Sequence, residues 1–165
     1  SIRFVLEKAL MREQFAVLHR RLLAVVRDDA VCHRLMTVPG VGPVVALTFR
    51  ATVDVPSRFA NSKAVGAVFG PTPRQHQSGE VNRMGYISKC GDAMMRAMLF
   101  EAAQVMLTRT IRWSWLKAWA MKIARHRGMK KAIVALARRL AVIMHRIWVD
   151  GTEFRWTREQ AAAAA

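Results

Sequence analysis

The amino-acid sequence predicts a mainly α-helical fold. Two long segments, 2–27 and 130–149, repeat apolar residues at helical spacing, with basic residues between them. Short polar residues that cap helices precede several apolar segments, and glycine or proline separates most of these segments. At 165 residues, of which 53% are hydrophobic, the chain has the length and the apolar content of one domain with a real core.

The first segment, 2–27, is expected to form a coiled-coil-like or bundle helix, because its apolar and charged residues fall on different sides. Asp28-Asp29 provides an N-cap for a short helix over 30–36. Later helices are expected at 63–69 after Asn61 or Ser62, at 93–108 after Asp92, at 113–125 with a break at Gly128, and at 130–149.

This order of elements predicts three parts. Residues 1–36 would form the coiled-coil-like or bundle helices, and 37–160 the second unit, with a short irregular or hairpin segment that carries a serine. The alanine run 161–165 is interpreted as a tag or linker.

A turn rich in glycine and proline joins two of the expected helices. Residues 37–49 read TVPGVGPVVALTF, which is typical of a helix-hairpin-helix. Gly40, Val41 and Gly42 would then direct backbone amides at a phosphate, and the helix that follows would add its N-terminal dipole. Such hairpins hold the nucleic-acid backbone without reading its sequence. The alternative is an ordinary turn between two core helices.

The charge of the chain favours a polyanionic partner. Lysine and arginine number 27 against 11 acidic residues, for a net charge of +16. An excess of this size is typical of nucleic-acid binding that weakens with salt. No apolar run approaches the roughly 18 residues of a membrane-spanning helix. Cys32 and Cys90 are too few and too far apart for a disulfide framework or a zinc site, so a reducing cytoplasm is expected.

A basic, glycine-containing segment surrounds Ser78. Arg74 and His76 precede this serine, and Arg83, Ser88 and Lys89 follow it. A hydroxyl that attacks a phosphodiester needs cations nearby, because charge builds on the non-bridging oxygens as the new bond forms. We therefore interpret Ser78 as a candidate nucleophile, with phosphate stabilised by Arg74, Arg83 and Lys89. The alternative is a turn-forming serine before Gly79.

Several other residues are candidates for contact with DNA. His76 and Ser88 lie beside the candidate nucleophile, and Arg96 follows on the next expected helix. Lys131 and Arg138 share a heptad phase with His145 on the last long helix; this basic stripe either contacts phosphate or is a solvated face. Tryptophans and methionines at helical spacing are expected to pack rather than to bind bases or metal, namely Trp113, Trp115, Trp119, Met94, Met95, Met98 and Met106. No metal site is expected in this chain.

Two strings carry a family resemblance, VPGVGPVVAL and SRFANSKAVGAVFGPTPRQHQSGEVNRMGYISKCGDAMMRAMLFEAA. In this order they resemble the C-terminal, serine-bearing domain of the insertion sequence 110 family of transposases, relatives of the Piv-type DNA invertases. The resemblance covers about 36–103, and the pairing of PRQHQSG with GYISKCG is its specific part. The chain departs from the family pattern at Glu80, where a small residue is usual, and at Met95, which replaces a leucine.

The resemblance implies an RNA-guided recombinase. A serine that matches Ser78 would attack the scissile phosphate and form a covalent phosphoserine link to DNA. A separate RuvC-like domain would contribute acidic residues that bind Mg²⁺, and a noncoding bridge RNA would pair with donor and target DNA. The protein would act as a dimer or tetramer in the bacterial cytoplasm, at the nucleoid, and these 165 residues alone are expected not to cut DNA.

The residues themselves leave two other functions open. One is a non-catalytic nucleic-acid-binding module in which the region of Ser78 is structural. The other is an assembly domain whose helices mainly hold protomers together.

Overall fold

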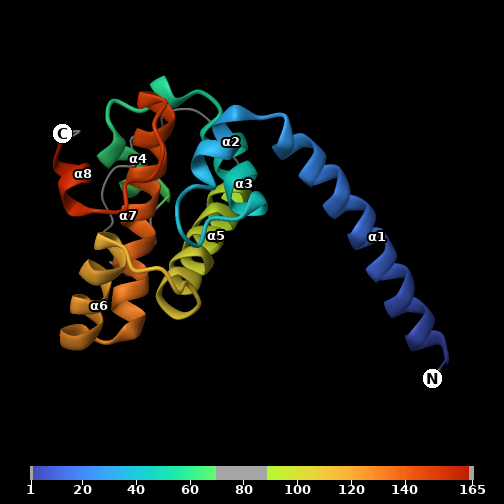
Figure 1. The fold of residues 1–165 in the computed structure, drawn as a ribbon. Coiled ribbons are helices and arrows are strands. Elements are labelled where there is room, and N and C mark those ends of the chain that lie inside the picture. The colour runs from blue at the N-terminus through green and yellow to red at the C-terminus, as the bar shows by residue number, and fades with distance from the viewer. Residues whose placement is uncertain (1, 70–88, 164–165) are drawn as a thin grey trace.

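The computed structural model describes residues 2–69 and 89–163, and for 89–92 the backbone alone. Every regular element in these ranges is helical, which confirms the predicted class (Figure 1). The elements are α1 (Ile2–Arg27), α2 (Ala30–Leu35), α3 (Pro43–Val53), the 3₁₀ helix η1 (Pro56–Arg58), α4 (Ser62–Phe69), α5 (Lys89–Thr108), α6 (Trp115–Arg127), α7 (Met129–Asp150) and α8 (Arg158–Ala162). None of these helices is long and apolar enough to cross a membrane.

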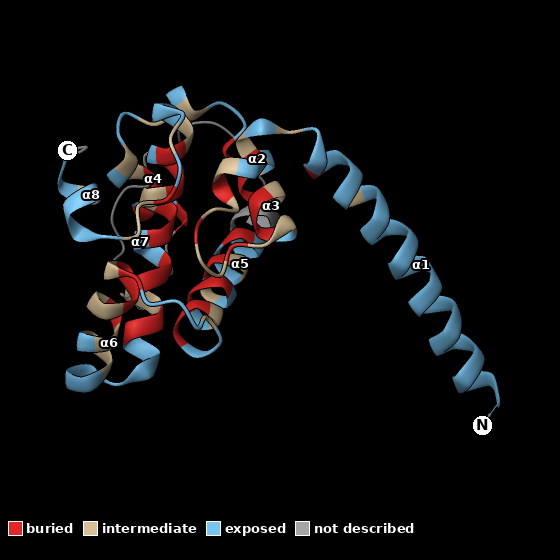
Figure 2. Ribbon diagram, in the orientation of Figure 1, coloured by how far each residue is buried: buried red, intermediate tan, exposed pale blue. Residues whose placement is uncertain are grey.

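Helix α7 is the centre of the fold. Helices α4, α5 and α6 all pack on it, and its buried face lies inside the body of the molecule (Figure 2). The buried residues repeat at helical spacing, as the sequence predicts; they include Ala132, Ile133, Leu136, Ala137, Leu140, Ala141, Met144 and Ile147. Gly66 lets α4 approach closely, because a Cβ there would lie 2.7 Å from Cγ2 of Val142.

A buried histidine joins α7 to η1 and to the start of α4. His145 is 3% exposed. Its Nε2 lies 2.9 Å from the Pro56 carbonyl oxygen, and its Nδ1 lies 2.9 Å from the Ser62 hydroxyl. A carbonyl only accepts, so Nε2 carries the proton and Nδ1 accepts from the serine. The sequence grouped His145 with the basic stripe of this helix; that prediction is wrong, because the side chain is a buried structural link.

Helix α2 and the turn after it also belong to the main core. Cys32 and Leu35 of α2 are fully buried in the same cluster as residues of α3, α5 and α7. The turn after α2 is fixed by Gly40, whose φ of 86° is in the left-handed region. A Cβ on Gly40 would overlap the Ala102 carbonyl oxygen of α5. Gly40 therefore sets how closely this turn approaches α5.

The predicted helix starts are partly right. Asp29 caps α2, and its carboxylate accepts from the amides of Val31 and Cys32. Asn61 accepts from the amide of Ala64 at the start of α4. The prediction for Asp92 is wrong, since α5 begins at Lys89; an acidic residue is also favourable inside the first turn, so it does not mark the boundary.

The start of α6 also differs from the prediction. The sequence placed it at Trp113, whereas α6 begins at Trp115. The Ser114 hydroxyl caps the helix by accepting from the amide of Lys117. The predicted stop at Gly128 is confirmed, because the chain reverses there with a φ of 88°.

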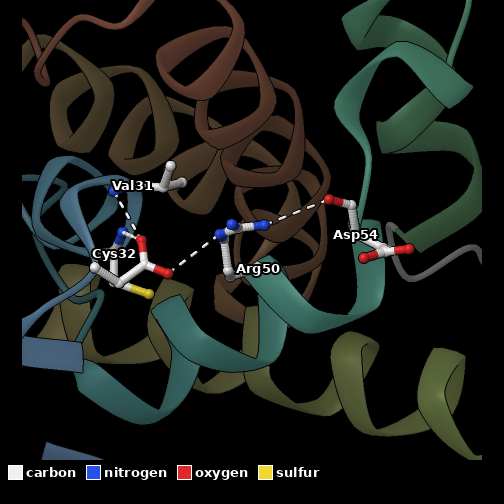
Figure 3. Close-up of polar contacts among 5 residues, drawn as sticks. Val31, Cys32, Arg50 and Asp54 are labelled. Atoms are coloured by element: carbon white, nitrogen blue, oxygen red, sulfur yellow. Dashed lines mark hydrogen bonds and ion pairs between the residues drawn. The ribbon is translucent and has the colours of Figure 1, made fainter. Parts of the chain in front are cut away.

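An ion pair links the start of α2 to α3 (Figure 3), and the arginine of this pair also contacts α7. The second carboxylate oxygen of Asp29 lies 3.2 Å from Nε of Arg50 on α3. Arg50 also donates to the Asp54 carbonyl at 3.4 Å, and its guanidinium lies 4.7 Å from the centre of the Trp148 ring on α7. A partly buried, hydrogen-bonded pair of this kind holds its elements in register more firmly than an exposed pair does.

Cys32 lies beside this ion pair. Burial raises the pKa of its thiol from the ordinary value of 9.0 to about 11; the Asp29 carboxylate adds to the rise, and the Arg50 guanidinium opposes it. The thiol is therefore neutral across the physiological range and behaves as a small apolar side chain.

Helix α1 stands apart from the body (Figure 1). Only its last turns reach the core, through Val26, which is buried, and Leu22, which is partly buried. The rest of the helix is exposed along its length (Figure 2), although it carries large apolar side chains. These include Phe4, Leu6, Leu10, Met11, Phe15 and Leu18, each more than half exposed.

The close approach at Gly40 predicts a sharp contrast between two neighbouring glycines. Gly40→Ala is expected to lower the free energy of unfolding by about 2 kcal/mol or more, because it combines a left-handed φ with an overlap on backbone. Gly42→Ala is the matched control: its Cβ would meet nothing within 4 Å, and its cost at an N-cap is about 1 kcal/mol or less. Urea unfolding of both variants measures the difference, and equal losses would contradict the packing of Gly40 on α5.

The raised pKa of Cys32 predicts a loss of stability in alkali. Below pH 9 the thiol is protonated in both states, so its contribution to stability is complete. Between pH 9 and about 11 the unfolded thiol ionises first, so the unfolded state binds fewer protons and the stability falls. Cys32→Ala should remove this component. The free energies of unfolding of wild type and Cys32→Ala are measured from pH 8 to 11, and a difference that stays constant with pH would refute the prediction.

Candidate nucleic-acid interface

The residues expected to act on a phosphodiester lie outside the described residues. This holds for Arg74, His76, Ser78, Arg83 and Ser88, and for the side chain of Lys89. The structure describes the elements on either side of them. Phe69, at the end of α4, is buried and packs edge-on against Phe59, with ring centres 5.7 Å apart. Met95 of α5 is buried as well. The two helices that precede and follow the serine segment in the sequence, α4 and α5, both pack on α7.

The expected hairpin turn divides into a packed part and an open part. Gly40 faces α5, and Val41 is 6% exposed with its amide bonded to the Val38 carbonyl at 3.1 Å. Gly42 is the N-cap of α3 and faces open space. Packing between helices thus accounts for Gly40 and Val41, the first two of the three residues that the sequence analysis assigned to the nucleic-acid backbone. Contact with a phosphate stays a prediction.

The candidate cations on α5 and α7 are accessible. Arg96, Lys131 and Arg138 are all exposed, as are Arg139 and Arg146 on the neighbouring edge of α7. Ion pairs within the described residues are Arg3–Glu7, Arg27–Asp28 and Arg50–Asp29. Among the described side chains of α4 to α8, none of the exposed cations is neutralised by a described carboxylate, so their charge is available to an anion from outside.

The tryptophans around α6 fall into two groups. Trp115 and Trp119 are partly buried against the core, as predicted. The guanidinium of Arg139 lies 5.4 Å from the ring centre of Trp115 and 4.5 Å from that of Trp119. Trp113 is 59% exposed, so the prediction that it packs is wrong. The reason is the position of the N-cap, because Trp113 precedes Ser114 and lies outside the helix.

The methionines of α5 mostly follow the prediction. Met95 and Met106 are fully buried, and Met98 packs partly against the core. Met94 is the exception, with 52% of its surface exposed, because it lies on the outer side of the helix next to Arg96.

A metal site does not arise from the described side chains. Across 2–69 and 93–163, no three His, Cys, Asp or Glu side chains come together in a group that could hold an ion. The Mg²⁺ that the family resemblance implies would be held by a separate RuvC-like domain, so it stays a prediction, and we derive no step through it.

Comparison with known proteins identifies relatives. Residues 32–120 match the family model described as "Transposase IS116/IS110/IS902 family". The chain is 36% identical over 124 residues to the transposase for insertion sequence element IS1111A of Coxiella burnetii, which covers 74% of this chain and 34% of that protein. It is 32% identical over 144 residues to the transposase for insertion sequence element IS1328 of Yersinia enterocolitica, covering 86% of this chain and 43% of the relative.

A third relative, y4pF/y4sB of Sinorhizobium fredii, is 32% identical over 150 residues, or 90% of this chain and 39% of the relative. The chain thus spans between a third and somewhat over two fifths of the length of these curated relatives.

Proposed function

The chain belongs to the IS116/IS110/IS902 family of transposases, and from this membership we propose that it binds DNA and supplies Ser78 as the nucleophile of phosphodiester strand transfer. The observation that carries the proposal is the extent of the family match. It covers 32–120 and so includes the whole serine segment together with the turn and helices on either side of it.

The proposed chemistry is a transesterification. The Ser78 hydroxyl attacks the scissile phosphate, an O–P bond to the serine forms, and the O–P bond to one DNA strand breaks. The displaced strand leaves as a hydroxyl that takes up the proton. A hydroxyl of another strand then attacks the phosphoserine and releases the enzyme. The number of phosphate ester bonds is conserved, so the exchange needs no external energy source.

The surrounding cations have two proposed roles. Arg74, Arg83 and Lys89 would neutralise charge on the pentacovalent phosphate, where fixed donors contribute most. Arg96, Lys131 and Arg138 would bind the DNA backbone at positions distant from the reacting bond. Their exposure and the absence of carboxylate partners in the described part of the chain support this second role.

The whole protein would contain more than this chain. We propose that a RuvC-like domain brings acidic residues and Mg²⁺ to the serine, and that a noncoding bridge RNA selects donor and target DNA. The site of action would be the bacterial cytoplasm, at the nucleoid. The lengths of the curated relatives leave room for such a domain.

Replacement of the nucleophile tests the proposal. In a protein that joins this chain to a RuvC-like domain, Ser78→Ala should abolish the covalent protein–DNA adduct and lower recombination at least about a thousandfold. Ser57→Ala is the matched control, because Ser57 is exposed on η1 and the substitution removes a serine hydroxyl at a different place. The adduct is measured by denaturing electrophoresis with end-labelled DNA.

Retention of the adduct in Ser78→Ala would refute the role of the serine. If strand exchange also persists while Arg83→Gln weakens DNA binding, the non-catalytic binding module is the better description. The Gly40 turn is less useful for this test, because substitution there is expected to disturb the fold itself.

We propose further that the protein is a homo-oligomer joined in part through α1. Phe4, Met11 and Leu18 recur every seven residues and are exposed at 57%, 68% and 61%. Phe15 follows Met11 by four residues and is 69% exposed. Alternating steps of three and four residues are the pattern of a coiled-coil seam. An isolated helix with such a face leaves unfavourable apolar surface in water.

Charges placed in this seam test the oligomer. At micromolar concentrations the wild-type chain should show a mass of at least twice its 18.6 kDa. The double variant Met11→Glu/Leu18→Glu should shift it to the monomer, because each change would bury a charge in the seam. Arg12→Glu/Arg20→Glu, outside the seam, is the control. Sedimentation across a concentration series measures the mass, and a monomeric wild type would refute the proposal.

A further inference from the structure

A cavity of about 370 Å³ lies between α7 and the chain that follows it. After α7 the chain turns back at Gly151, whose φ is 63°, and passes along the helix. Trp115 fixes this returning segment with two hydrogen bonds. The Trp115 amide donates to the Trp156 carbonyl at 3.1 Å, and the Trp115 indole Nε1 donates to the Arg155 carbonyl at 2.8 Å. A capping box at Thr157 then starts α8. Both walls of the cavity are therefore preformed.

The lining combines an apolar floor with a basic rim. The floor includes Ile143 and Ile147 from α7 and Phe154 from the returning chain. The rim carries arginines on both walls, namely Arg139, Arg146, Arg155 and Arg158. Two carboxylates, of Asp150 and Glu153, also line the cavity, so the arginines outnumber them two to one. None of the four arginines forms an ion pair with a described carboxylate.

Two of these arginines are already held in place. The guanidinium of Arg139 lies over the rings of Trp115 and Trp119, and a guanidinium held by aromatic rings can still donate its N–H groups to an anion. Arg155 donates to the Gln160 carbonyl at 3.1 Å. An arginine ordered in advance loses less side-chain entropy when it binds phosphate. Arg146 and Arg158 are exposed and complete the rim from opposite walls.

The size and chemistry of the cavity define its ligand. Sites for small molecules measure roughly 300–1,000 Å³, so this cavity has room for one nucleotide but not for a duplex. An apolar floor suits a base or a sugar face, and guanidinium groups suit phosphate. We propose that the cavity binds one unpaired nucleotide of a single-stranded nucleic acid, with its phosphates on the arginine rim. This proposal rests on the proposed function, in which the protein handles nucleic acid.

The test compares two pairs of arginines that remove the same charge. Arg146→Gln/Arg158→Gln removes the charge of two exposed rim arginines and spares Arg139 and Arg155, which have structural contacts. Arg125→Gln/Arg127→Gln is the control, because both residues are exposed on α6 and neither lines the cavity. Fluorescence anisotropy with labelled ten-nucleotide oligo(dT), oligo(U) and a ten-base-pair duplex measures binding at several salt concentrations.

The rim pair should lose about tenfold more affinity for the single strands than the control pair does. For the rim pair, the slope of the logarithm of the binding constant against the logarithm of the salt concentration should also become shallower by about 1.4. This is the value for two lost phosphate contacts on a single strand. Duplex affinity should change equally in both pairs. The tighter of oligo(dT) and oligo(U) identifies the natural strand as DNA or RNA. A cross-link from 4-thiothymidine or 4-thiouridine should map to Trp115 or Phe154.

Equal losses of single-strand affinity in the rim and control pairs would overturn the proposal. Displacement of the bound oligonucleotide by an acidic peptide, at the same ionic strength, would also overturn it. These results are separable from those for the proposed function. If the rim pair behaves like the control while wild type still forms the Ser78 adduct, only the cavity assignment fails. If Ser78→Ala keeps the adduct while the rim pair loses single-strand binding, only the role of the serine fails.

Discussion

Burial of one face of α7 is the constraint on which the other elements depend. Helices α4, α5 and α6 each cover part of that face, and α2 also contacts α7 directly. Helix α3 packs on α5 and reaches α7 through Phe49 and Arg50, which both lie against Trp148. Close approach at Gly66 and the two hydrogen bonds of His145 fix the position of α4 along α7. Since Phe69 and Lys89 border the segment that carries Ser78, the placement of α4 and α5 on α7 also decides where that segment starts and ends.

The outer side of α7 is divided in a way that suits two kinds of contact. Lys131 and Arg138 form one basic edge, and Arg139 and Arg146 form the next. The first edge is exposed to solvent, which suits electrostatic contact with the phosphates of a DNA backbone. The second borders the cavity closed by the returning chain and is ordered by tryptophan. A single helix would thus serve duplex and single strand through neighbouring rows of its surface.

Local signals in the sequence were sufficient for most of the helices and for several of their caps. Helix α8 was not predicted, and its last two residues belong to the run interpreted as a tag or linker. Periodicity located α1 and α7, and Asp29, Asn61 and Gly128 mark ends where the sequence predicts them. Features that depend on partners far along the chain were not predictable. His145 has the spacing of a surface residue in the basic stripe, and only its partners 83 and 89 residues away place it inside. The clash that reserves position 40 for glycine comes from Ala102, on a helix the turn does not adjoin in sequence.

The attachment of α1 has a mechanical consequence. Its 26 residues extend about 39 Å at 1.5 Å per residue, yet it is anchored near one end, by Leu22 and Val26. It is therefore a lever: a rotation of about 10° at its root displaces the far tip by roughly 7 Å, from the same rise per residue. The direction of α1 is set by the short junction at Asp28 and Asp29, and a fixed position of its far end requires a second packing contact along the helix.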